Sequence, residues 1–190
     1  MTHRSNLLTP LTVETSLEAK DLGLSVKWAN MNCEANSNIE SGNYYRWMSV
    51  YGNDWISQGI EIASTHSDKY SLAGDAANVK MGNKWRMPTV EETEEFIDNI
   101  QSELANIGGT DGYIITSKLN GAKIFLPICG AKDTHGESKE LKYDSDVSFW
   151  IAKNSFQSSY ARCLNHTPDG WNTNGQDALL SLPIRGVMEY

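Results

Sequence analysis

The chain has 190 residues, with 16 lysines and arginines against 24 aspartates and glutamates, so its formal net charge is −8. That length suits one domain, and a hydrophobic class of 39% suits a folded chain rather than a disordered one. The apolar runs are far shorter than the ~20 residues that span a bilayer, which excludes a membrane-spanning helix. The acidic balance argues against nucleic acid as a partner, because a phosphate-binding surface needs clustered cations.

The first 20 residues are polar and lack periodicity, so we expect a flexible N-terminal arm (1–20) leading into one domain (21–190). This start contains no hydrophobic stretch of the kind that a signal peptide needs. Two interpretations remain open: the protein does not use that export route, or its signal is absent from this chain.

The first elements in chain order are a strand, an irregular segment and a short helix. Apolar residues at every second position from Leu22 to Trp28 predict a half-buried strand. Residues 30–74 are rich in Asn, Ser, Gly and aromatic side chains, which favours a long irregular segment. A short helix is expected over residues 74–81.

The clearest helix signal follows Pro88. Thr89 and Glu92 have the spacing of a capping box, in which each side chain bonds the other residue's backbone N–H. Apolar residues then recur at helical spacing over residues 96–104. The pair Gly108-Gly109 is expected to end this helix.

A hairpin is predicted next, with strands over 113–117 and 122–128. They flank Asn120-Gly121, the dipeptide that best supplies the two positive φ angles of a type I′ turn. Residues 131–146 are charged and resemble a loop. Three short strands are predicted to complete the chain, over 148–152, 159–164 and 179–187.

Neither the cysteines nor the histidines point to chemistry. Cys33, Cys129 and Cys163 have no zinc-ligand spacing, and they are expected to be buried free thiols or one disulfide with one free thiol. The histidines lie in polar contexts without an adjacent nucleophile motif: His3, His66, His135 and His166. The sequence therefore predicts no catalytic residue, no cofactor and no metal site.

Seven segments in a fixed order carry a resemblance to a known family. They are Asp21–Ala29, Gly42–Trp47, Asp75–Asn78, Lys84–Thr89, Ile124–Pro127, Phe149-Trp150 and Leu182–Val187. Over about residues 21–187 the chain resembles the Fibrobacter succinogenes major paralogous domain family, which is common in gut Bacteroidetes. The resemblance implies an α+β, C-type lectin-like fold with small antiparallel sheets, two helices and long loops.

The resemblance also implies a setting and a function. Its relatives are mostly surface or secreted proteins that bind ligands, and some proteins of this fold are phage or bacterial targets of diversity-generating retroelements. The implied location is thus the cell surface or the secreted space, with a phage virion as the alternative. Formylglycine-generating enzymes share the fold, but the cysteines here stand in unremarkable contexts.

Family signatures are expected to be structural in this chain. Trp85 and Met87 should pack in the core, and Trp28, Trp150 and Arg185 should do the same. Sugar-binding C-type lectins hold calcium through E-P-N or Q-P-D and W-N-D motifs, whereas this chain has Thr167-Pro168-Asp169 and Trp171-Asn172-Thr173. Because the second motif lacks its acid, a simple Pro-Asp-Gly turn is the preferred interpretation.

The segment 154–177 combines short amides and hydroxyls with Phe156, Tyr160 and Trp171. Evolved binding loops have this composition, although a solvated loop between core strands would also have it. The predicted ligand-binding residues are Asn154, Gln157, Ser158, Tyr160, Arg162, Asn165, Trp171, Asn172 and Asn174.

The functional expectation is a non-enzymatic module that binds a glycan or protein for adhesion or receptor recognition. The alternatives are a structural or assembly component of a surface or phage complex, compatible with an oligomer, and a formylglycine-type enzyme.

Overall fold

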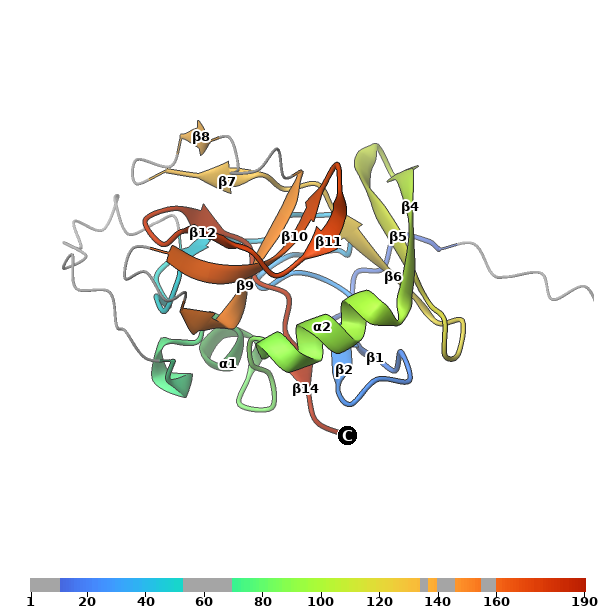
Figure 1. Cartoon of the computed structure of the whole chain (residues 1–190), viewed down its shortest axis with the longest axis horizontal. Coiled ribbons are helices and arrows are strands. Elements are labelled where there is room, and N and C mark those ends of the chain that lie inside the picture. Colours follow the sequence, from blue (N-terminus) through green and yellow to red (C-terminus); the bar gives the residue numbers. More distant parts are fainter. Residues whose placement is uncertain (1–10, 53–69, 134–136, 140–145, 155–159) are drawn as a thin grey trace, which may run out of the picture.

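The computed structural model describes residues 11–52, 70–133, 137–139, 146–154 and 160–190. Within these ranges the chain forms four small antiparallel sheets and two α-helices, an α+β arrangement that confirms the coarse prediction (Figure 1). No helix in this part of the chain is long and apolar enough to cross a membrane.

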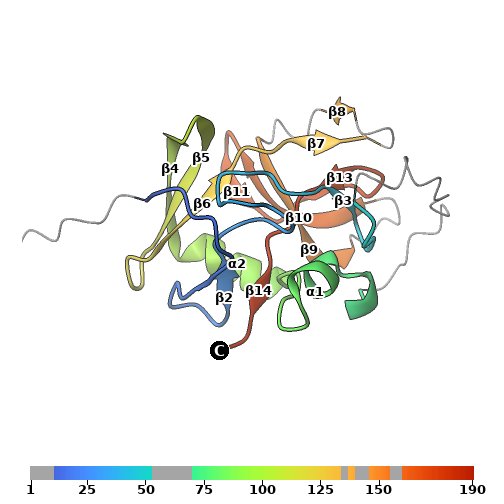
Figure 2. The same ribbon diagram turned by 180° about the vertical axis from the view of Figure 1, so that it is seen from behind.

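Segments near both ends of the chain share one sheet (Figure 2). Its strands, in spatial order, are β1 (Ala19–Lys20), β2 (Lys27–Ala29) and β14 (Val187–Met188). The predicted alternation is confirmed in burial, because Leu22, Leu24, Val26 and Trp28 are all buried. Ladder pairing is nevertheless limited to the last of these residues.

The described part of the predicted arm is attached to the domain. The Asn38 side-chain oxygen accepts a bond from the Glu14 N–H, and Asn38 N–H donates to the Glu14 carbonyl, at 3.0 and 2.9 Å. Asn30 makes the same reciprocal pair with Glu18, at 2.8 and 3.0 Å. Residues 14–18 are therefore held by two buried asparagines, and residues 1–10 lie outside the described chain.

Both helices begin at side-chain caps. Helix α1 (Ala76–Met81) follows a short 3₁₀ turn, η2 (Leu72–Gly74), and is capped by Asp75, whose carboxylate accepts from the Ala77 and Asn78 N–H groups. Helix α2 (Val90–Asp98) carries the predicted Thr89–Glu92 capping box, which is confirmed. The two reciprocal bonds satisfy backbone donors that the first turn leaves free.

The predicted extension of α2 to Gly108 is wrong. Residues Ile100–Ile107 form strand β4, which pairs along its whole length with β5 (Thr110–Ser117). Gly108 and Gly109 both have positive φ, so they form the two-residue hairpin turn instead of a helix end. Leu104, read as part of the helix face, is exposed.

The second predicted hairpin is confirmed in its strands but not in its turn. β5 pairs with β6 (Lys123–Pro127), which completes the sheet β4-β5-β6. Only Gly121 of the Asn120-Gly121 pair has positive φ, and its N–H donates to the Ser117 carbonyl at 3.0 Å. The type I′ prediction is therefore wrong, because Asn120 is held otherwise: its amide donates to the Asp21 carbonyl at 2.9 Å.

The remaining strands form two further sheets. The first contains β9 (Val147–Asn154), β10 (Tyr160–Thr167), β11 (Gly170–Asn172) and β12 (Gly175–Asp177), with β10 paired to the other three. The second contains β3 (Tyr45–Arg46), β13 (Ser181–Leu182), β7 (Ala131–Lys132) and β8 (Ser138–Lys139), in that spatial order. The late strands predicted over 148–152 and 159–164 correspond to β9 and β10. The 179–187 prediction splits into β13 and β14, and the predicted loop 131–146 contains β7 and β8.

The residues that were predicted to pack in the core do so. Trp28 and Trp150 are fully buried, and Trp28 packs against Phe96 with ring centroids 4.3 Å apart. Trp85 and Met87 are also buried. Arg185 is fully buried and donates to the carbonyls of Ala29 and Phe125 at 3.1 and 3.0 Å.

All three cysteines are free, so the free-thiol interpretation holds and the disulfide alternative does not. Burial raises the pKa of each thiol, to about 12 for Cys33 and Cys129 and further for Cys163. The thiols are thus protonated at neutral pH and are poor nucleophiles.

Candidate functional site

Within the predicted binding segment 154–177, residues 160–172 form a hairpin of β10 and β11. Pro168 and Asp169 occupy its two-residue turn, which agrees with the Pro-Asp-Gly turn interpretation, and the following Gly170 has positive φ. The register places His166 opposite Trp171 and Asn165 opposite Asn172. Because side chains alternate along β10, Asn165 and His166 point to opposite sides of the sheet.

Helix α2 lies beside this hairpin (Figure 1). A groove of about 400 Å³ runs between the helix and the hairpin. The helix supplies Glu94, Ile97 and Asp98 to the groove. The hairpin and the residues after it supply Trp171, Asn172, Thr173 and Asn174. An indole, two amides, a hydroxyl and two carboxylates thus surround one open cavity.

Trp171 is half-buried and fixed from several directions. Its indole N–H donates to the Ser102 hydroxyl at 3.0 Å. Its ring meets those of Tyr113 and His166 edge-on, with centroids 5.6 and 4.8 Å away. Such ring contacts orient the indole, so the groove has a pre-positioned aromatic wall.

Asp146 supports the aromatic wall from behind. One carboxylate oxygen lies 2.9 Å from Nδ1 of His166, and the other accepts from the Tyr113 hydroxyl at 2.5 Å. Burial and the Asp146 hydrogen bond raise the pKa of Tyr113, which keeps its hydroxyl a donor. Sequence reasoning missed this arrangement, because the three residues form no motif in sequence. The start of β9 brings Asp146 beside His166 of β10, and Tyr113 comes from β5 in another sheet.

Asn165 lies beneath the groove rather than in it. The side chain is fully buried, and its amide donates to the Asn174 carbonyl at 2.7 Å. Its oxygen accepts from the Ser148 hydroxyl and from the Gln176 amide. As a result Asn165 holds the Asn172–Asn174 segment in place and offers no exposed surface to a ligand.

The other predicted residues differ in position. Arg162 donates to the carbonyl and hydroxyl of Thr173, at 3.1 and 3.2 Å, and so braces the groove wall. Tyr160 and the backbone of Asn154 lie at the opposite end of the β9–β10 pair from Trp171. Gln157 and Ser158 lie outside the described residues. The structure thus brings Trp171, Asn172 and Asn174 together.

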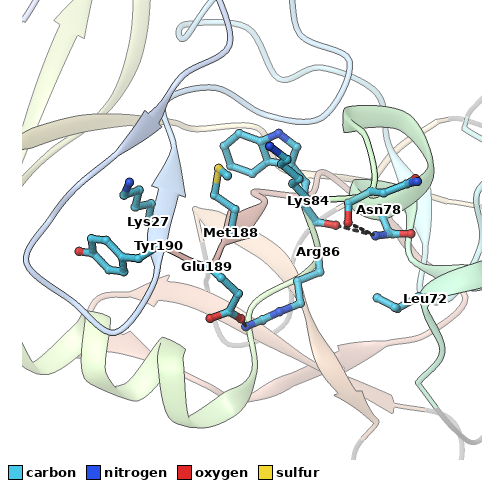
Figure 3. Close-up of a pocket in the computed structure, with 10 residues that line it drawn as sticks. Lys27, Leu72, Asn78, Lys84, Arg86, Met188, Glu189 and Tyr190 are labelled. Carbon is cyan, nitrogen blue, oxygen red and sulfur yellow. Dashed lines mark hydrogen bonds and ion pairs between the residues drawn. The ribbon is translucent and has the colours of Figure 1, made fainter.

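A second cavity, of about 470 Å³, lies between the sheet β1-β2-β14 and the segment around Trp85 (Figure 3). Sequence reasoning assigned Trp85 only a core role and missed this cavity. No local sequence pattern could have revealed this cavity, because Lys27 and Tyr190, which both line it, lie near opposite ends of the chain.

No known family model, curated protein or solved structure matches this chain. Within the described ranges, no group of three or more His, Cys, Asp and Glu side chains is placed to hold a metal ion.

Proposed function

We propose that the protein is a non-enzymatic, C-type lectin-like module that binds a glycan in the groove between α2 and the β10–β11 hairpin. The single observation that carries this proposal is the groove itself, in which Trp171 and Asn174 face the acidic residues of α2. Sugars present an apolar ring face beside several hydroxyls. An aromatic wall with amide and carboxylate groups complements both features.

The arrangement of the chain supports the finer fold assignment. The first and last strands, β1, β2 and β14, share one sheet, and the described residues contain two α-helices and further small antiparallel sheets. The raised thiol pKa values favour a binding protein over a formylglycine-type enzyme. The reciprocal bonds at residues 14–18 give less support to an assembly role for the arm, because those groups are already occupied.

The setting proposed with this function is a bacterial cell surface, with a phage virion and retroelement-driven diversification as the alternative. A near-copy of the 3′ end of the gene beside a reverse-transcriptase gene would support the alternative. A gene neighbourhood without either would favour the bacterial surface.

The test uses groove residues whose side chains carry little of the fold. Trp171→Ala would be ambiguous, since the indole also packs on Tyr113 and His166. Asn174 and Glu94 are exposed, so Asn174→Ala and Glu94→Gln should fold normally. Glu91→Gln is the matched control, because Glu91 is exposed on the same helix but does not line the groove.

Labelled protein is first screened on a glycan array, and the best glycan is then titrated by calorimetry. Each groove variant should weaken binding about tenfold, equivalent to about 1.4 kcal/mol, and the control should bind as wild type. Absence of any glycan hit, or equal affinity for all variants, contradicts the proposal. Calcium independence of the titration is also expected. A protein ligand that binds the wild type, and binds both groove variants more weakly, would instead support protein recognition.

A further inference from the structure

The cavity of Figure 3 is independent of the groove and has a different chemistry. It lies where β2 and β14 meet the segment that links α1 to α2. Figure 3 shows Lys27 and Tyr190 at one side, Asn78 and Leu72 at the other, and Arg86 with Glu189 between them. The complete lining is Lys27, Leu72, Asn78, Asn83, Lys84, Trp85, Arg86, Met188, Glu189 and Tyr190.

Backbone and amide bonds form the walls in advance. The Arg86 N–H donates to the Val187 carbonyl at 3.0 Å, and the Val187 N–H donates to the Arg86 carbonyl at 2.8 Å. The Asn78 amide donates to the carbonyls of Trp85 and Asn83, at 3.0 and 3.2 Å. A ligand would therefore meet a formed cavity and would not have to order it.

The inner surface is apolar and closely packed. Trp85 is 8% exposed, and a side chain at Gly186 would place a Cβ 3.2 Å from its ring and 3.0 Å from the Met81 sulfur. Met188 and Leu72 add an apolar thioether and an aliphatic side chain. Thioether and aromatic side chains favour contact with a flat ring.

Basic side chains line the rim, although the chain as a whole is acidic. Lys27, Lys84 and Arg86 lie there together with the Glu189 carboxylate. Arg86 is already paired, with both its terminal nitrogens on Glu92 and one also 2.6 Å from Glu189.

The two lysines supply the available charge. Among the described residues Lys84 has no carboxylate within ion-pair distance and its side chain is exposed. Lys27 places its ammonium 4.8 Å from the centre of the Tyr190 ring. The Tyr190 hydroxyl is anchored to the Asp21 carboxylate at 2.7 Å. An anionic group of a ligand could therefore approach the ammonium groups of Lys27 and Lys84.

We propose that this cavity binds a small aromatic carboxylate, with its ring against Trp85 and Met188 and its carboxylate toward Lys84 and Lys27. The volume falls in the usual range for small-molecule sites, about 300–1,000 Å³. Two ammonium groups match one carboxylate and are too few to hold a polyanion such as nucleic acid.

The probe is 2-naphthoate, titrated by calorimetry into the full chain, with the neutral 2-naphthamide as the matched ligand. The carboxylate should bind about tenfold more tightly than the amide, and added salt should remove most of this difference. Lys84→Gln should weaken naphthoate binding about threefold to tenfold and leave naphthamide binding unchanged.

Two control variants make the result specific. Lys139→Gln removes the same charge from an exposed position in β8, which lies far from β14 and α1 (Figure 1). This variant should bind naphthoate as wild type. Asn174→Ala in the other groove should also bind naphthoate normally, so failure of the glycan proposal and failure of this one are distinguishable. Equal affinity for naphthoate and naphthamide, no binding of either, or an unchanged Lys84→Gln affinity would overturn the proposal.

Discussion

Replacing Asn165 by alanine tests whether this residue supports the groove from beneath. In the folded protein its amide bonds the Asn174 carbonyl at 2.7 Å, and its oxygen accepts from Ser148 and Gln176. Asn165→Ala removes one side of each bond at a fully buried position. Water cannot replace the lost partners without entering the core.

The magnitude follows from the groups left unpaired. A buried polar group without a partner costs about 1–3 kcal/mol, and the Asn174 carbonyl and Ser148 hydroxyl are the two most affected. The Ser148 hydroxyl also bonds the Cys163 thiol, which offers it another partner. We therefore expect the lower part of the combined range, about 2–4 kcal/mol lost from the free energy of unfolding.

Urea denaturation followed by tryptophan fluorescence measures this loss, and the double variant Ser148→Ala/Asn165→Ala isolates the coupling. The double variant should lose about 1 kcal/mol less than the sum of the single losses, because Ser148 can no longer be left unpaired. Glycan binding by Asn165→Ala should weaken as well, since the Asn174 backbone loses its anchor. A loss below about 0.5 kcal/mol, or strict additivity, would refute a supporting role.

Two further predictions concern packing and pH. Gly112→Ala places a Cβ 2.4 Å from the Phe125 ring and should lower the free energy of unfolding, measured by urea denaturation, by over about 2 kcal/mol. Gly109→Ala meets open space and should lower it by only about 1 kcal/mol, because the φ of Gly109 is positive. Equal losses for the two variants would contradict the steric explanation. Burial raises the pKa of the Cys163 thiol above its ordinary 9.0, so the stability that it contributes is complete below about pH 9 and is lost as the pH rises further. The free energy of unfolding should fall less steeply above pH 9 in Cys163→Ala than in wild type, by up to about 1.4 kcal/mol per pH unit, and parallel pH profiles would count against this assignment.

Local sequence patterns predicted the elements that depend on near neighbours. The capping box joins Thr89 and Glu92 across one helical turn, and both of its bonds form as expected. The alternation from Leu22 to Trp28 matches the burial of every second side chain. Such signals succeed because the interacting groups lie within a few residues of each other.

The same kind of signal was misleading at residues 100–107. The spacing of apolar residues predicted a helix there, but it carries no information about β5, the strand with which these residues pair. Two consecutive glycines with positive φ are equally compatible with a helix end and a tight hairpin turn from sequence alone. Pairing with a neighbouring strand decided between the two.

In the candidate site, composition by itself identified Trp171, Asn172 and Asn174, because amides and aromatics are typical of binding loops. Only the tertiary structure separated the exposed Asn174 from the buried Asn165, placed the carboxylates of α2 across the groove, and joined Asp146 to His166. Local hydrogen bonds and periodicity depend on residues close together in the sequence, whereas the register between distant strands is set by packing of the whole chain.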